Sequence, residues 1–338
     1  VLQGPLPPAN PAARKTGFRT RTYADLLAFN GFTQTDELDA VVSAWEHLFG
    51  FVQADLIVCD HAPIASLAAC RRIPFVRFGN GFTAPPAAGQ CFPVLRPDVE
   101  ATTREEEIYD VVGRVLQRRG LPLPTSVPAL FAGEDTFVAA YPEFDPYDKQ
   151  RTSRALGPLE IPAEPTPLPQ EHAFFAYLPR NHPDLNKLVT SLAAAGLNGA
   201  VYIPPGREDA RRVLREADIR VLDTPHPYRE CFPNVTAILH HGGLGTAAAG
   251  LAAGRPQVCC PIYFEQHLNA QVVQKLGCGL TVGNLVPPEK AGEALRQVMR
   301  EERYAAAAQN QARALARRFP DGSLQTIADR CCAILENG

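Results

Sequence analysis

The chain has 338 residues, of which 46% are hydrophobic and 20% are charged, and its formal net charge is −3. This length and composition are sufficient for two globular domains that each bury a core of their own. There is no basic stripe of the kind that binds nucleic acid and no apolar run near the roughly 18 residues of a membrane helix, which argues against both classes.

The N-terminal part begins with a proline-rich, basic stretch, residues 1–20, which reads as the middle of a longer chain rather than the start of a domain. Apolar residues at helical spacing then predict helices over residues 23–30 and 36–51, with Trp45 in the core. Strands and helices alternate after that: strands 55–60, 74–78 and 136–141, and helices 64–72 and 103–119. This alternation predicts a parallel α/β domain, and three strands are few for a complete doubly wound sheet.

A linker is predicted over residues 146–170, where charged residues are mixed with repeated proline. It separates a domain over residues 1–145 from a second domain over residues 171–338. The second domain alternates regularly, with strands at 172–178, 199–203, 219–222, 235–239 and 257–262 and a last strand before Gly283, and with closing helices at 287–300, 302–318 and 322–336. Six strands with intervening helices predict a complete Rossmann-like domain.

The stretch from residue 235 to 283 carries the strongest functional signal. Its first strand ends at His240 and His241, and an alanine-rich helix follows at once. Such a helix presents unpaired N–H groups and its positive dipole end at the carboxyl edge of the sheet, which is a place for phosphate. A hydroxyl from Thr246 joins that turn, and three glycines let the backbone approach a ligand closely: Gly242, Gly243 and Gly245.

Beyond the next strand, at the same edge of the sheet, lie Glu265 and Gln266. A carboxylate and an amide beside a nest of N–H groups suit a diphosphate joined to a polyol. The plainer alternative is that both residues only begin a helix, where acids are favoured by the dipole. Asn269, one turn on, can support either the loop or a phosphate.

These motifs resemble the donor signature of the family 1 glycosyltransferases. The similar segments are HGGLGT (241–246), AGRPQ (253–257), Pro261 and EQHLNA (265–270). The resemblance implies the GT-B fold, which has two Rossmann-like domains with parallel sheets, and a nucleotide-diphosphate sugar as co-substrate.

The resemblance also implies roles for individual residues. His241, the backbone at Gly243 and Gly245, and the Thr246 hydroxyl would contact the diphosphate. Glu265 and Gln266 would hold the sugar hydroxyls, although the family usually has Asp at the position of Glu265.

The N-terminal half resembles the later part of the acceptor domain of bacterial members, at Tyr-Ala-Asp (23–25), Trp45, residues 54–58 and Asp-His-Ala-Pro (60–63). The first strand, the glycine loop with the catalytic His and about two further strand and helix units of that domain have no counterpart, so we expect the N-terminal domain to be incomplete. By resemblance, Asp60 corresponds to the acid that orients the catalytic His; alternatively, it caps the helix that begins near Pro63. His61 is a candidate replacement base, because His suits proton transfer near neutral pH.

Two loops depart from the family pattern. Relatives have a small Gly-Ser turn where this chain has residues 177–181, and Arg180 can replace those donor contacts with charge. In residues 224–228, His226 or Tyr228 is a candidate for stacking on the nucleotide base.

Neither a metal nor a resident cofactor is expected. Adjacent residues on a strand end point to opposite sides, so His240 and His241 do not suit one ion, and the family needs no metal. Nine cysteines lack Cys-x-x-Cys or Cys/His zinc spacing, and we expect them to be buried, reduced thiols of a soluble, cytoplasmic protein.

The expected function is an inverting, metal-independent glycosyltransferase that moves a sugar from a UDP- or dTDP-sugar to a hydroxyl of a small, hydrophobic acceptor. One alternative is a sugar-nucleotide epimerase or hydrolase with the same donor crevice. The other is a non-catalytic protein that binds nucleotide sugars, motivated by the absent His loop.

Overall fold

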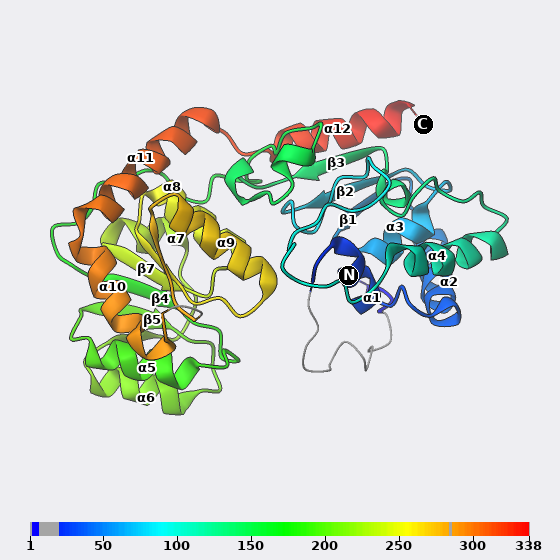
Figure 1. Ribbon diagram of the computed structural model, residues 1–338. Coiled ribbons are helices and arrows are strands. Elements are labelled where there is room, and N and C mark those ends of the chain that lie inside the picture. The colour runs from blue at the N-terminus through cyan, green and yellow to red at the C-terminus, as the bar shows by residue number, and fades with distance from the viewer. Residues whose placement is uncertain (1, 7–19, 284–285, 338) are drawn as a thin grey trace. The chain divides into compact units, whose positions relative to one another are not determined.

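The computed structural model describes residues 2–6, 20–283 and 286–337 and has two compact units (Figure 1). The first unit comprises residues 1–157 and 323–338, and the second comprises residues 158–322. Most of the predicted proline-rich stretch lies outside the described residues. None of the described helices is long and apolar enough to cross a membrane.

The first unit is built on a three-stranded parallel sheet in the order β1-β2-β3. These strands are β1 (Ile57–Asp60), β2 (Phe75–Gly79) and β3 (Asp135–Val138), so the three strands predicted for this part are confirmed. Its helices are α1 (Tyr23–Phe29), α2 (Thr35–Val52), α3 (Pro63–Ala69) and α4 (Glu105–Arg118). Three short 3-10 turns complete it: Pro128–Phe131, Pro142–Phe144 and Asp148–Gln150.

The core of this unit gathers apolar faces of these four helices against the sheet. Trp45 is only partly buried at the margin of this core, with its ring 5.5 Å from that of Phe49. Asp25 is fully buried in α1, and its carboxylate accepts N–H groups from Arg21, Thr22, Thr102 and Thr103. One carboxylate therefore fastens the start of α1 to the segment before α4, because four donors compensate its burial.

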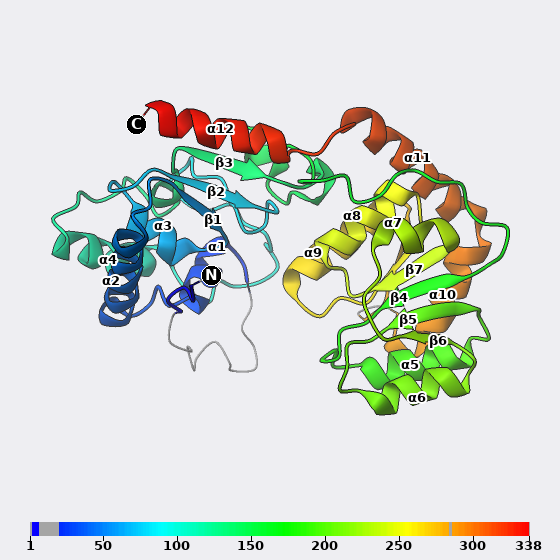
Figure 2. The same ribbon diagram turned by 180° about the vertical axis from the view of Figure 1, so that it is seen from behind.

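The last helix, α12 (Leu324–Asn337), corrects the sequence prediction, which assigned residues up to 338 to the second domain. It belongs to the first unit and lies alongside β3 in Figures 1 and 2. Three contacts explain this. The Ser323 hydroxyl donates to the Gly157 carbonyl (3.0 Å), Ile327 is buried, and Arg330 Nε pairs with the Asp135 carboxylate at 3.0 Å.

The second unit contains a six-stranded parallel sheet in the order β6-β5-β4-β7-β8-β9, the strand order of a Rossmann fold. Its strands are β4 (Phe174–Tyr177), β5 (Gly199–Tyr202), β6 (Arg220–Leu222), β7 (Ala237–His240), β8 (Gln257–Cys259) and β9 (Gly279–Thr281). Short apolar strands suit a sheet that is covered on both faces, and β7 and β8 are buried throughout.

Helices cover both faces of this sheet (Figure 1). They are α5 (Leu185–Ala194), α6 (Glu208–Glu216), α7 (Tyr228–Cys231), α8 (Leu244–Ala253), α9 (Phe264–Lys275), α10 (Ala291–Arg300) and α11 (Glu302–Arg318), with 3-10 turns at Phe232–Asn234 and Pro288–Lys290. α5 packs against α6 and α10, whereas α8 packs against α9 and α11. The crossovers place the ends of β4, β5, β7 and β8 at one edge of the sheet.

The boundary between the units falls within the predicted linker, at Gly157 and Pro158. Part of this segment is bound to the second unit by hydrogen bonds. Residues 158–170 belong to the second unit, where the buried Arg255 guanidinium donates to the carbonyls of Thr166 and Pro167 and to the Thr166 hydroxyl. Gln309 of α11 donates to the same Thr166 carbonyl at 2.9 Å.

Candidate functional site

The two adjacent histidines at the end of β7 have different surroundings. His240 is completely buried; its Nδ1 accepts the Gly242 N–H (3.1 Å), so its Nε2 carries a proton and donates to Gln257 Oε1 at 2.8 Å. Gln257 in turn donates to the Ala247 carbonyl of α8 at 3.1 Å. Burial lowers the pKa of His240 to about 4, so this imidazole is neutral and ties the strand end to the following helix.

His241 lies over the glycine loop. A Cβ on Gly243 would come within 2.8 Å of its Nε2, so the imidazole rests on a residue that has no side chain. Its Nδ1 is buried and has no hydrogen-bond partner within the described part of the chain. Burial, helped by the nearby His182, lowers the pKa of His241 and favours the neutral ring.

The start of α8 has the features of an anion site. Gly243 is the N-cap residue, and no side chain caps the helix. The N–H groups of the first turn therefore have no intrahelical acceptor. Gly242 has φ +82°, and a Cβ there would lie 2.8 Å from the Gln266 carbonyl oxygen, so this turn requires glycine. A Cβ on Gly245 would meet nothing within 4 Å, which leaves open space beside the helix end.

The polar residues around this loop have definite partners. Thr246 is buried, and its hydroxyl lies 2.8 Å from the Tyr228 hydroxyl. Asn269 is also buried and donates to the Gly242 carbonyl at 3.0 Å, so it supports the loop, which is one of its two expected roles. Gln266 Oε1 accepts the N–H of Ile262 (2.9 Å), which makes it a capping residue at the start of α9. Glu265 is half-buried in the first turn of the same helix.

Arg180 and His226 lie further from the loop. Arg180 is exposed after β4, where its carbonyl accepts a hydrogen bond from Arg207 at 3.3 Å. His226 lines a pocket of about 420 Å³ that also includes Asn198, Gly199 and Arg220. The lining of that pocket shares no residue with the glycine loop.

The sequence prediction missed three residues that surround His241. Tyr177 ends β4 and meets the His241 ring edge to face, with centroids 5.1 Å apart. Tyr202 ends β5 directly opposite Tyr177, with centroids 5.7 Å apart. His182, in the loop after β4, is buried and pairs through Nε2 with the Cys260 carbonyl (3.0 Å). The position of both tyrosines at strand ends was the available signal, because ligands of such sheets bind beyond the carboxyl ends of the strands.

The first unit places Asp60 and His61 at the end of β1. The alternative that Asp60 caps α3 is wrong: the N-cap is Ala62, and no side chain caps the helix. Pro63 at the first helical position explains this, since proline has no N–H to satisfy. His61 has φ +42°, and its Nδ1 is buried without a partner among the residues described. Burial lowers the pKa of His61, and the Asp60 charge opposes that shift.

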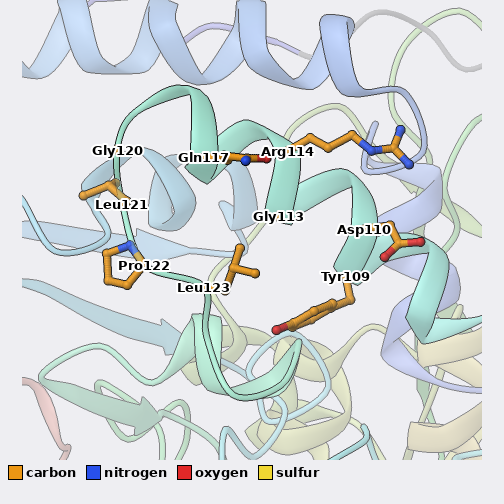
Figure 3. A pocket seen from close by; sticks show the side chains of 9 residues that line it. All are labelled: Tyr109, Asp110, Gly113, Arg114, Gln117, Gly120, Leu121, Pro122 and Leu123. Carbon is orange, nitrogen blue, oxygen red and sulfur yellow. The ribbon is translucent and has the colours of Figure 1, made fainter.

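A pocket of about 530 Å³ lies elsewhere in the first unit, between α4 and the turn after it (Figure 3). Tyr109, Gly113 and Leu123 contribute to its lining, and it contains none of the predicted site residues. Within the described ranges, no group of three or more His, Cys, Asp or Glu residues lies together as a metal site would require.

All nine cysteines are free thiols. Four are buried, as expected: Cys59, Cys259, Cys260 and Cys278. The expectation of burial is wrong for Cys91 and Cys332, which are exposed because they lie in a surface loop and on the outer side of α12.

Comparisons with known proteins agree with this arrangement. Residues 201–334 match the family model described as "Erythromycin biosynthesis protein CIII-like, C-terminal domain". The elloramycin glycosyltransferase ElmGT of Streptomyces olivaceus is 37% identical over 116 residues, which are 34% of this chain and 29% of that protein. The L-demethylnoviosyl transferase of Streptomyces niveus is 24% identical over 81% of this chain and 66% of its own length. The chain thus spans less than a third of the first of these relatives and about two thirds of the second.

Solved structures extend the similarity to nearly the whole fold. The glycosyltransferase VinC has a TM-score of 0.66 at 19% identity, covering 98% of this chain and 86% of its own. The calicheamicin glycosyltransferase CalG4 has a TM-score of 0.64 at 21% identity, covering 89% and 78%. These neighbours show that the chain has the GT-B fold of these glycosyltransferases, with its glycine loop at the carboxyl edge of the second sheet.

Proposed function

We propose that this protein transfers a sugar from a nucleotide-diphosphate sugar to a hydroxyl group of a small, hydrophobic acceptor. One observation carries the proposal: His241, whose buried Nδ1 has no partner within the described residues, lies beside the uncapped start of α8. A buried polar atom without a partner is costly unless a ligand supplies the missing interaction. The ligand that fits beside free helix N–H groups is an anion.

The chemistry of this helix start matches a diphosphate. First-turn N–H groups of α8 donate to phosphate oxygens, and the open side of Gly245 admits them. A protonated His241 nitrogen adds a donor, and the Thr246 hydroxyl adds another. The half-buried carboxylate of Glu265, on the next helix, is the proposed acceptor for sugar hydroxyls.

The identity of the donor and acceptor is supported by related proteins. The VinC structure is a complex with dTDP, and another structural neighbour, the spinosyn rhamnosyltransferase SpnG, was solved with thymidine diphosphate and with spinosyn aglycone. We therefore propose a dTDP-sugar rather than a UDP-sugar as the preferred donor, and a hydrophobic aglycone as the acceptor.

In the proposed reaction, a base removes the proton from the acceptor hydroxyl and the oxygen attacks the anomeric carbon from the face opposite the diphosphate. The bond between the anomeric carbon and the phosphate oxygen breaks, and its electron pair leaves with the nucleoside diphosphate. The configuration is inverted, no metal takes part, and the start of α8 stabilises the departing charge. His61 is the proposed base, because burial favours its neutral form, and Asp60 is its electrostatic partner.

Calorimetric titration with dTDP and UDP tests the donor site. We expect saturable binding, with dTDP preferred, and at least tenfold weaker binding after His241→Ala because a charge-assisted hydrogen bond contributes about 1.5–3 kcal/mol. His172→Ala, an exposed histidine before β4, is the matched control and should bind like the unmodified protein. Binding that survives His241→Ala unchanged contradicts the proposed site. Mass spectrometry of reactions with a dTDP-sugar then separates transfer to an aglycone from hydrolysis or epimerisation of the donor and from binding without turnover.

A further inference from the structure

Two tyrosines that have no role in the proposed reaction contact two of the residues proposed to bind the donor diphosphate. The Tyr177 ring meets His241 at an interplanar angle of 83° with centroids 5.1 Å apart. The Tyr228 hydroxyl lies 2.8 Å from Thr246 Oγ1. Each tyrosine thus contacts one polar side chain at the start of α8.

The position of Tyr177 is set by the sheet rather than by a loop. It is the last residue of β4, which pairs with β5 on one side and with β7 on the other. In this register Tyr177 lies opposite Tyr202 and opposite His240. The Tyr202 ring packs on Tyr177 at 5.7 Å, away from the contact with His241. Burial and the nearby Tyr228 and Tyr202 raise the pKa of Tyr177, consistent with one compact aromatic group.

His241, in contrast, has no hydrogen bond that orients its ring. Within residues 2–6, 20–283 and 286–337 its Nδ1 has no partner, and its Nε2 faces the bare backbone of Gly243. Histidines that bind ligands normally have one ring nitrogen fixed by a carbonyl or carboxylate, which sets the tautomer and the ring plane. Here the ring plane depends on packing, and Tyr177 is the aromatic residue packed against it.

We propose that Tyr177 is a positioning residue that holds the His241 imidazole in the plane required to bind the donor diphosphate, and that Tyr228 likewise orients the Thr246 hydroxyl. The proposal rests on the proposed function for its consequence in donor binding. The orientation of the two side chains can be tested without any nucleotide.

A double-mutant cycle tests the first half. Loss of an edge-to-face ring contact should weaken dTDP binding about tenfold in Tyr177→Ala, whereas Tyr177→Phe, which keeps the ring, should stay within about twofold. If Tyr177 acts through His241, adding Tyr177→Ala to His241→Ala should weaken binding no further. Additive losses, or a Phe variant as weak as the Ala variant, overturn the proposal.

Tyr202→Ala is the matched control, since it removes a ring from the same group that does not touch His241. We expect dTDP affinity within about threefold of the unmodified protein, because the Tyr202 ring packs on Tyr177 and acts on His241 only indirectly. A loss as large as that of Tyr177→Ala indicates collapse of the aromatic group and overturns a specific role for Tyr177.

A measurement without nucleotide separates failure of this proposal from failure of the proposed function. Histidine-selective ¹⁵N labelling reports the tautomer and exchange of each imidazole. We expect one ordered set of His241 ring signals in the unmodified protein and in Tyr177→Phe, and exchange-averaged signals in Tyr177→Ala. Unchanged His241 signals in Tyr177→Ala overturn the proposal whether or not dTDP binds, whereas altered signals with no dTDP binding in any variant leave the positioning intact and overturn the proposed donor.

Removal of a single hydroxyl tests whether Tyr228 orients Thr246. Tyr228→Phe removes only the hydroxyl, and we expect about fivefold weaker dTDP binding, the size of one neutral hydrogen bond. In a Thr246→Val background, which lacks the partner hydroxyl, Tyr228→Phe should have no further effect on affinity. Equal losses in both backgrounds contradict the role of Tyr228.

Discussion

Two strand ends in this chain carry a histidine whose Nδ1 is buried without a partner among the described residues: His241 after β7 and His61 after β1. In both rings burial lowers the pKa. The helices that follow differ. α8 has ten residues and begins at Leu244, directly after its N-cap Gly243, whereas α3 has seven residues and begins at Pro63.

The difference shows that a histidine at a strand end does not make an anion site by itself. At β7 the imidazole lies beside free N–H groups and open space at Gly245, so a phosphate finds several donors at once. At β1 proline removes an N–H, and the nearest charge to His61 is the carboxylate of Asp60. The Asp60 carboxylate would repel an anion there, whereas its charge favours proton uptake by His61.

His240 ties the end of β7 to the glycine loop and, through Gln257, to α8. His240→Phe leaves Gln257 Oε1 and the Gly242 N–H without partners in the core, so we expect a loss of about 2–4 kcal/mol in the free energy of unfolding. Urea denaturation at pH 7 measures it. The exposed His172→Phe should change stability by less than about 0.5 kcal/mol.

The pH dependence of stability tests the same residue. The pKa of His240 is about 4 when folded and about 6.5 when unfolded, so between these values the unfolded chain binds a proton that the folded chain does not. His240 therefore contributes stability above pH 6.5 that is lost as the pH falls towards 4. His240→Phe should be less sensitive to acid over this range than the unmodified protein; an equal slope of unfolding free energy against pH contradicts a buried, neutral His240.

Much of the second unit could be predicted from the sequence, because its strands and glycine turns are local patterns. The six strands follow from apolar runs, and the start of α8 follows from the glycines before it, of which Gly242 has a positive φ that other residues rarely adopt. The sequence does not decide between two roles for Asn269 and Gln266, because an amide side chain can bond either to the backbone or to a ligand. The fold brings backbone partners within reach of both side chains.

Partners distant in sequence could not be predicted. Tyr177 and His241 are neighbours only because β4 and β7 pair across a crossover, and helix α12 joins the first unit through Asp135, far from it along the chain. Arg255 looked like part of a motif, but its guanidinium holds the extended segment at Thr166. Such pairings depend on topology, which a one-dimensional pattern does not contain.

Gly243, the N-cap of α8, and Gly245, in its first turn, differ in what an added Cβ would meet. A Cβ at Gly243 would contact His241 Nε2 at 2.8 Å, so Gly243→Ala should displace the ring and reduce both stability, by about 1 kcal/mol, and dTDP affinity. A Cβ at Gly245 meets no protein atom, so Gly245→Ala should raise helix stability by about 0.5–1 kcal/mol while filling the proposed phosphate space. Thermal unfolding and calorimetry on both variants measure the two effects. Equal affinity in Gly245→Ala and the unmodified protein contradicts a ligand at this helix end.

At the end of β1, Asp60 directly precedes His61. Asp60 is exposed, so Asp60→Asn should change the free energy of unfolding by less than about 0.5 kcal/mol. It removes the charge that raises the pKa of His61, so that pKa should fall further. If His61 is the base, it must be unprotonated to act, and the acid limb of the kcat/KM profile should move to lower pH in Asp60→Asn while the rate at the plateau falls with the weaker base. Asp55→Asn, an exposed carboxylate just before β1, is the matched control and should leave the profile in place. A profile that is the same in all three proteins means that the proton acceptor is not His61, and the two strand ends would then share a histidine without sharing a role in the reaction.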